Sequence, residues 1–131
     1  MISLFDWSEY LDLAEFLRNG CPDDLREACY RSAISRSYYA AYNTAKTFAR
    51  DNEGFQPVRS GVDHRLVRKH FESNPLSEKR DIAIQLRRLN VWRNKCDYDD
   101  VIDDLPKILQ LSLRRAEGVI TLILKMRESQ H

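Results

Sequence analysis

The stretch between Pro22 and Gly54 constrains the fold more than any other part of the chain, because its apolar residues recur three or four positions apart. These positions are Tyr30, Ile34, Tyr38, Ala41, Ala45 and Phe48. Their spacing matches the turn of an α-helix and places them on one face, which we expect to be buried. Asp23 and Asp24 suit the first turn of such a helix, and Gly54 suits its end near Asn52. The stretch therefore predicts one long helix.

Three other main segments and one short basic segment, residues 64–73, show the same helical period. Their starts are marked by Asp6 with Glu9 three residues later, by Ser77, and by Pro106 in a first turn. The chain of 131 residues contains only four glycines and four prolines, which leaves few turns for an all-β or α/β fold. We therefore expect one all-α domain spanning the whole chain, an up-down bundle of four main helices plus the short basic helix.

The last predicted helix has more apolar surface than one face of a bundle requires. A seven-residue spacing runs through Ile102, Leu105, Leu109, Ser112, Ala116, Val119 and Ile123. A second apolar flank consists of Ile108, Leu111, Leu122 and Leu124. Two arrangements fit this breadth: the helix is central and packs on two sides, or part of its surface forms a dimer interface.

Composition and charge indicate an ordinary folded protein without a global preference for a charged partner. The formal net charge is +1, so nucleic-acid binding would require a local basic patch. Cys21, Cys29 and Cys96 are odd in number and widely spaced, which argues against disulfides and a structural zinc site. The first residues lack the basic start of a signal peptide, and no apolar run reaches membrane-spanning length. We expect a cytoplasmic protein with no membrane association.

The motifs of common enzyme classes do not occur in the sequence: there is no phosphate-binding loop, dinucleotide fingerprint or GxSxG elbow. His64 and His70 are six positions apart, which places them on different faces of a helix and disfavours a zinc pair. The acidic run between Asp97 and Asp104 lacks the spacing and the glycine of a calcium loop. It is more typical of a solvated, helix-capping stretch. We therefore expect neither a metal nor a cofactor.

Two segments of the chain together resemble one superfamily. Residues 31–42 read RSAISRSYYAAY in the long helix, and residues 89–99 read LNVWRNKCDYD in a later one. SRSYYAAYNTA is similar to the SRxYYAxxxxA helix of small prokaryotic HEPN (higher eukaryotes and prokaryotes nucleotide-binding) proteins, and RNKCDYD to their RxxADYD segment. The resemblance covers nearly the whole chain, including the helix order and the basic loop between the two segments.

The resemblance implies a HEPN-like helical bundle that dimerises to form a shared cleft. Active members are metal-independent endoribonucleases of toxin–antitoxin, phage-defence and CRISPR-associated systems. Their signature is an Arg followed by four to six residues and a His, often with a polar residue directly after the Arg. Arg93 and Asn94 match its start, whereas Tyr98 stands where the shortest spacing places the His. The implied catalytic residues are thus Arg93, Asn94 and Tyr98, with a degenerate last position.

The chemistry of these side chains is consistent with a phosphate site. A guanidinium holds a phosphate bidentately and stabilises its developing charge, and an adjacent amide such as Asn94 orients it. A metal-free ribonuclease also needs a group that titrates near neutral pH, and a phenol, with an ordinary pKa of about 10, is a poor base. Tyr98 could still donate a hydrogen bond or stack on a base. Alternatively, Arg93 and Asp97 form a helix pair that ties the helix end to the following loop.

Basic residues gather in the predicted loop and short helix and reappear further along, at Arg59, His64, Arg65, Arg68, Lys69, His70, Arg87 and Arg88. They could hold an RNA backbone, with nearby aromatic rings stacking on single-stranded bases, or they could be a scattered solvated face. His64 is the histidine that could replace the missing base.

Arg36 and Tyr39 are three positions apart on the long helix, so they could face the same cleft as Arg93. The alternative is that Arg36 pairs with an acid of the last helix. We expect Tyr38 and Tyr42 to belong to the core.

Two functional hypotheses follow. In the first, the chain is a homodimeric HEPN-type protein that acts on RNA and cleaves it through attack of the 2′-hydroxyl, without a metal. In the second, it is a non-catalytic HEPN interaction module that binds a nucleotide, or partners a minimal nucleotidyltransferase or an antitoxin. The missing His favours the second hypothesis, and the Arg93–Asn94 pair favours the first.

Overall fold

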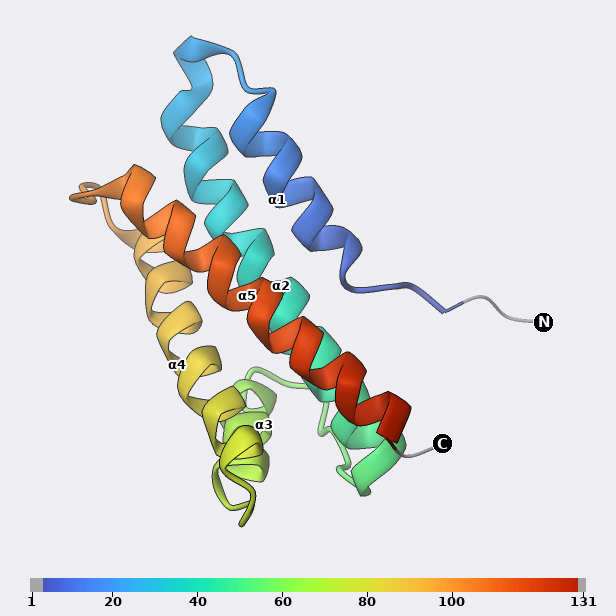
Figure 1. The fold of residues 1–131 in the computed structure, drawn as a ribbon. Helices are drawn as coiled ribbons and strands as arrows, with labels where there is room; N and C mark the ends of the chain where they lie inside the picture. The colour runs from blue at the N-terminus through green and yellow to red at the C-terminus, as the bar shows by residue number, and fades with distance from the viewer. Residues whose placement is uncertain (1–3, 130–131) are drawn as a thin grey trace.

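The computed structural model describes residues 4–129, which form five α-helices and one short 3₁₀ turn (Figure 1). In chain order these are α1 (Glu9–Asn19), the 3₁₀ turn (Asp23–Leu25), α2 (Arg26–Glu53), α3 (Asp63–Glu72), α4 (Ser77–Tyr98) and α5 (Leu105–Ser129). No strand occurs in this part of the chain, so the prediction of an all-α fold is confirmed. The predicted short basic helix is α3, and the other predicted helices are α1, α2, α4 and α5.

The starts of α1, α2 and α4 differ from the predicted signals. Asp23 and Asp24 lie in the 3₁₀ turn before α2, and Ser77 is the first residue of α4 without a capping hydrogen bond. Asp6 was expected to cap α1; instead, its carboxylate accepts hydrogen bonds from the backbone N–H and the hydroxyl of Ser8, at 3.0 and 2.7 Å. These bonds close a turn that precedes the helix.

The end of α2 and the first turn of α5 follow the predicted signals. Gly54 ends α2 with a left-handed φ of 73° and donates its N–H to the carbonyl of Ala49, as a C-terminal glycine should. Pro106 is the second residue of α5, within the first turn as predicted.

The long helix α2 is the centre of the molecule and contacts all four other helices. In Figure 1, α1 lies beside α2 and α5 crosses in front of it. The contact faces of α2 carry fully buried small residues, namely Ala33, Ala40, Ala41, Ala45 and Ala49. Because these side chains are short, neighbouring helices approach closely, and the larger Tyr38 and Phe48 fill the remaining space.

Packing within the chain accounts for part of the apolar surface on α5. This helix contacts α1, α2 and α4, so it is packed on more than one side. Leu109, Leu113, Val119 and Ile123 are buried against these neighbours, whereas Leu124 is exposed. Packing of α5 on more than one side is therefore observed. Its second apolar flank, Ile108, Leu111, Leu122 and Leu124, is only partly buried or exposed, so the dimer interface stays a prediction.

The cysteines of the α1–α2 connection form a disulfide between Cys21 and Cys29, with Cα atoms 6.3 Å apart. The expectation of no disulfide was wrong, because Pro22 and the 3₁₀ turn fold the chain back and bring the two residues together. The pairing removes cysteine usage as an argument for a reducing compartment. Cys96 is free and buried, and burial raises the pKa of its thiol to about 11. None of the described helices is both long and apolar enough to cross a membrane.

A partly buried ionic group joins the ends of α2, α3 and α4. Glu53 on α2 accepts hydrogen bonds from Nε2 of His70, at 2.9 Å, and from Nζ of Lys79. Burial alone would raise the pKa of Glu53, but the bonds from Lys79 and His70 outweigh it and hold the pKa below its ordinary value. The carboxylate thus fixes α3 and the start of α4 against α2.

At the other end of α4, Arg31 of α2 makes a second tie. Its guanidinium donates hydrogen bonds to the backbone carbonyls of Cys96, Asp99 and Asp100, at 3.1, 2.6 and 3.2 Å. The carbonyl of Cys96 is in the last turn of α4 and that of Asp100 follows the helix, in a region where helix carbonyls lack partners within the helix. Arg31 therefore joins the two sequence segments that resemble HEPN proteins.

Candidate functional site

The candidate site is a cluster of aromatic and basic side chains from α2, α3 and α4, which we call the tyrosine cluster. Its members are Arg36, Tyr38, Tyr39, Tyr42, His64 and Arg93. Three of these residues, Tyr38, Tyr39 and Tyr42, project from α2 at helical spacing and provide the surface on which the others lie.

Arg93 is held by its own helix. Its guanidinium donates to Oδ1 of Asn90 at 2.6 Å and to Oδ2 of Asp97 at 3.4 Å, residues three and four positions away. The predicted Arg93–Asp97 helix pair is therefore confirmed. Only 11% of the Arg93 side chain is exposed, and its buried Nε has no hydrogen-bond partner among the described residues. The guanidinium is thus fixed in position while one of its donors is unused.

The same guanidinium lies over the aromatic surface of α2. Its carbon is 5.3 Å from the ring centre of Tyr38 and 5.5 Å from that of Tyr39. On the other side, the guanidinium of Arg36 lies 4.9 Å from the ring centre of Tyr39 and 5.0 Å from that of Tyr10. Such cation–π contacts stabilise two cations at short range. Arg36 thus faces the cluster, and no salt bridge joins it to an acid of the described part of α5.

His64, the second residue of α3, completes the cluster. Its Nδ1 is hydrogen-bonded to the hydroxyl of Tyr38, and its ring stacks on Tyr42 with centres 4.3 Å apart and planes 15° apart. Burial lowers the pKa of His64, and the positive charges of Arg93, Arg68 and Lys46 lower it further. The imidazole is therefore neutral at neutral pH and able to accept a proton.

The loop before α3 places His64 against α2. The carboxylate of Asp63 accepts hydrogen bonds from the backbone N–H groups of Val58 and Arg59, both at 2.9 Å. These bonds hold the pKa of Asp63 below its ordinary value although the residue is buried. Arg59 has a left-handed φ of 61°, a strained conformation for a non-glycine residue, and the second bond stabilises it. Asp63 therefore fixes the position of the histidine beside it.

Two tyrosines of the cluster, Tyr38 and Tyr42, are buried and remain protonated. Tyr38 and Tyr42 belong to the core, as predicted, but their inner location does not isolate them from His64. Burial raises the pKa of both phenols far above the ordinary value. The Tyr38 hydroxyl can donate to His64 or accept from it, so the phenol matches either tautomer of the imidazole.

Three of the predicted site residues lie outside the cluster. Asn94 and Tyr98 are exposed near the end of α4, and Tyr98 is 76% exposed. Arg65 is exposed on α3. Arg36, Tyr39, His64 and Arg93, with Asp97 as the partner of Arg93, are the predicted residues that the structure brings together. Among the described residues, no three or more His, Cys, Asp or Glu side chains form a group that could hold a metal ion.

Two residues that contact the tyrosine cluster, Asn90 and Lys46, were not predicted from the sequence. Asn90 is the nearest acceptor for Arg93, and Lys46 lies 5.4 Å from the ring centre of Tyr42. A signal for both was present, because Asn90 precedes Arg93 by three positions and Lys46 follows Tyr42 by four, which are neighbouring positions on a helix. Next to the cluster, Arg68, Arg80 and Arg87 line a shallow groove between α3 and α4. Arg68 and Arg87 of the predicted basic surface thus lie together along the groove between α3 and α4.

Comparison of the chain with protein-family models, with curated proteins and with solved structures gives no match. The resemblance to HEPN proteins therefore rests on the two sequence segments and stays a prediction.

Proposed function

We propose that the chain is a HEPN-type protein that binds RNA at the tyrosine cluster and cleaves it without a metal. The observation that supports this most is the meeting of His64 and Arg93 on the ring of Tyr38, although they come from different helices. A histidine with a lowered pKa next to a fixed guanidinium provides a base and a phosphate-binding group within one site. His64 would then supply the base that the sequence segment around Arg93 lacks.

In the proposed reaction, Arg93 binds a phosphate of single-stranded RNA through the exposed part of its guanidinium, and Arg36 and Tyr39 bind the neighbouring nucleotide. His64 donates from Nδ1 to the Tyr38 oxygen, which leaves the Nε2 lone pair free to take the proton of the ribose 2′-hydroxyl. The 2′-oxygen bonds to phosphorus, the bond to the 5′-oxygen breaks, and the leaving oxygen takes a proton from solvent. The products are a 2′,3′-cyclic phosphate and a 5′-hydroxyl.

The exposed predicted residues have outer roles in this proposal. Asn94 and Tyr98 contact the RNA beyond the cluster, and Arg65 with the other basic residues of α3 holds the backbone. The proposal also includes the up-down order of the four main helices and the dimer with a shared cleft that the resemblance implies. Exposed Ile84 and Val91, seven positions apart on α4, are suitable for such an interface.

The test is cleavage of a mixed-sequence RNA in EDTA by the wild type and by His64→Gln, Arg93→Ala and Arg93→Lys. We expect the wild type to leave 2′,3′-cyclic ends, and His64→Gln to be slower by about 100-fold or more because a general base is lost. Arg50→Ala is a matched control, since Arg50 is an exposed arginine outside the cluster and outside the predicted basic surface. An inert wild type, or equal rates for the wild type and the His64 variant, would exclude His64 as the base.

A second function is favoured by the way Arg93 is held. Its bonds to Asn90 and Asp97 are also those of a structural tie at the end of α4, and such a tie needs no reaction. In this case the chain is a non-catalytic HEPN module that binds a nucleotide or a minimal nucleotidyltransferase. Fluorescence anisotropy with labelled RNA distinguishes the two functions, because a module that acts only on a protein partner shows no salt-dependent RNA binding.

A further inference from the structure

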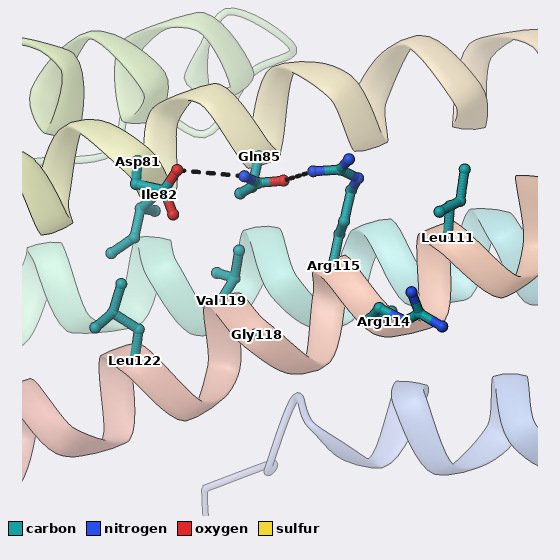
Figure 2. A pocket seen from close by; sticks show the side chains of 9 residues that line it. All are labelled: Asp81, Ile82, Gln85, Leu111, Arg114, Arg115, Gly118, Val119 and Leu122. Atoms are coloured by element: carbon teal, nitrogen blue, oxygen red, sulfur yellow. Dashed lines mark hydrogen bonds between the residues drawn. The ribbon is translucent and has the colours of Figure 1, made fainter.

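A second polar site lies in a groove between α4 and α5 and uses no residue of the tyrosine cluster (Figure 2). The groove has a volume of about 320 Å³. This is at the lower end of the range for small-molecule sites, about 300–1,000 Å³. Figure 2 shows Arg114 and Arg115 on one side of Val119 and Asp81, Ile82 and Leu122 on the other, with Leu111 beyond the arginines. The groove therefore combines charged and apolar parts.

Hydrogen bonds fix the position of Arg115 in the groove. Its guanidinium donates to Oε1 of Gln85 at 2.6 Å, and Gln85 donates in turn to Asp81 at 3.3 Å, as the dashed lines in Figure 2 mark. The ring of Trp92 lies 5.8 Å from the guanidinium carbon. The buried Nε has no hydrogen-bond partner within residues 4–129. The guanidinium is thus oriented by an uncharged amide and keeps an unused donor.

The positive charge of the two arginines is not neutralised by an ion pair. Within the described part of the chain, neither Arg114 nor Arg115 forms a salt bridge. Asp81 contributes one negative charge on the other side of Val119, so the lining carries two cations and one anion, a net charge of +1. A singly charged anion balances this lining, whereas a doubly charged one would leave the groove with a net charge of −1.

The middle of the groove is apolar and open. Ile82, Val119 and Leu122 form its aliphatic wall. Gly118 leaves the space open, because a Cβ at this position would meet nothing within 4 Å. Glycine costs a helix about 1 kcal/mol relative to alanine. An exposed glycine in α5 therefore lowers helix stability and widens the groove at the same point.

We propose that this groove binds a small amphipathic carboxylate, with its carboxylate on Arg114 and Arg115 and its apolar body along Ile82, Val119 and Leu122. A carboxylate is planar and singly charged, and its two oxygens match the parallel donors of a guanidinium. This site is independent of the proposed action on RNA and stands whether or not the chain cleaves RNA.

Sodium octanoate is a suitable probe, and Trp92 is a reporter because it contacts Arg115. The titration uses a Trp7→Phe background, so that Trp92 is the single tryptophan, and calorimetry measures the same affinity without the reporter. We expect saturable octanoate binding, weaker binding of 1-octanol, and none of octylamine. Arg115→Met should weaken octanoate binding about tenfold or more, because a charged hydrogen bond is lost.

Position 118 provides variants that separate binding from folding. Gly118→Leu places a side chain in the groove and should abolish octanoate binding, while thermal unfolding shows a stable fold. Gly118→Ala adds a single methyl group and should keep most of the affinity. The proposal is overturned if the wild type gives no saturable signal, if octanol or octylamine binds as tightly as octanoate, or if Arg115→Met or Gly118→Leu binds octanoate like the wild type.

Discussion

Arg93 and Arg115 make the same kinds of contact with an amide and an aromatic ring, but their charged neighbours differ. Each guanidinium donates a 2.6 Å hydrogen bond to a side-chain amide, Asn90 for Arg93 and Gln85 for Arg115. Each lies over an aromatic ring and has a buried Nε without a partner in the described part of the chain. The difference is in the neighbours that carry or accept charge.

Arg93 pairs with the carboxylate of Asp97 and lies in the same cluster as His64, whereas Arg115 has neither a carboxylate nor a histidine among its hydrogen-bond and salt-bridge partners in residues 4–129. An amide orients a guanidinium without neutralising it, and a carboxylate does both. Similarly packed arginines can therefore have different roles. We propose phosphate binding beside a general base for Arg93 and binding of an anion for Arg115. The expected outcomes below test this difference, beginning with the largest effect.

The largest effect is expected from removing each guanidinium in turn. Arg93→Met should lower the rate of RNA cleavage in EDTA by about 100-fold or more, since a preorganised charge at the phosphate is lost. Arg115→Met should leave this rate within about twofold, because Arg115 lies outside the tyrosine cluster. Gel-resolved cleavage rates measure both. Equal losses in the two variants would mean that the difference between the arginines has no functional meaning.

The pH dependence should differ next. The proposed base must be neutral, and the pKa of His64 lies below its ordinary value of about 6.5. Cleavage should therefore be maximal above this lowered pKa and fall as the pH drops through it. Arg93→Met removes one of the charges that lower the pKa, so an NMR titration of His64 should show a higher pKa in this variant. In Arg115→Met the titration should match the wild type; a shift there would contradict the assignment.

A smaller effect is expected from the two amides. Asn90→Ala should lower RNA cleavage about tenfold, because the guanidinium of Arg93 loses its shortest bond and its fixed position. Gln85→Ala should instead weaken octanoate binding and leave cleavage unchanged. Rates and calorimetry on both variants give a crossed comparison. The interpretation fails if either variant affects both activities to the same degree.

The smallest effect is expected at Asp97. Asp97→Asn removes a partly exposed helix pair and should lower the free energy of unfolding by about 0.5 kcal/mol in urea titrations. The same change makes Arg93 more like Arg115, so RNA should bind about twofold more tightly in low salt. Asp81→Asn is the matched control, because Asp81 bonds to Gln85 and not to an arginine. Weaker RNA binding by Asp97→Asn would show that the carboxylate assists rather than competes.

Helical periodicity predicted those parts of the structure that depend on one helix at a time. The all-α fold, the burial of Tyr38 and Tyr42, and the Arg93–Asp97 pair all follow from spacings of three or four residues. The Arg36–Tyr39 contact has the same origin. Such predictions succeed because helix geometry fixes which neighbours meet, whatever the rest of the chain does.

Contacts between elements were less predictable. The meeting of His64 with Tyr38 depends on the loop that Asp63 organises, and no periodic pattern encodes that loop. The Cys21–Cys29 disulfide was missed for a related reason, since the turn that joins the two residues is irregular. The groove beside Arg115 depends on the distance between α4 and α5, which cannot be predicted from the sequence of either helix.

The tie made by Arg31 has a consequence for how RNA binding should be measured. Its guanidinium bonds to three backbone carbonyls, which carry no net charge and do not titrate. Added salt screens charge pairs, such as the one between Arg31 and Glu27, far more than such bonds, so we expect the alignment of α2 with the end of α4 to depend little on ionic strength. A decline in RNA affinity with rising salt then counts the phosphates in contact with the protein rather than a change of its shape.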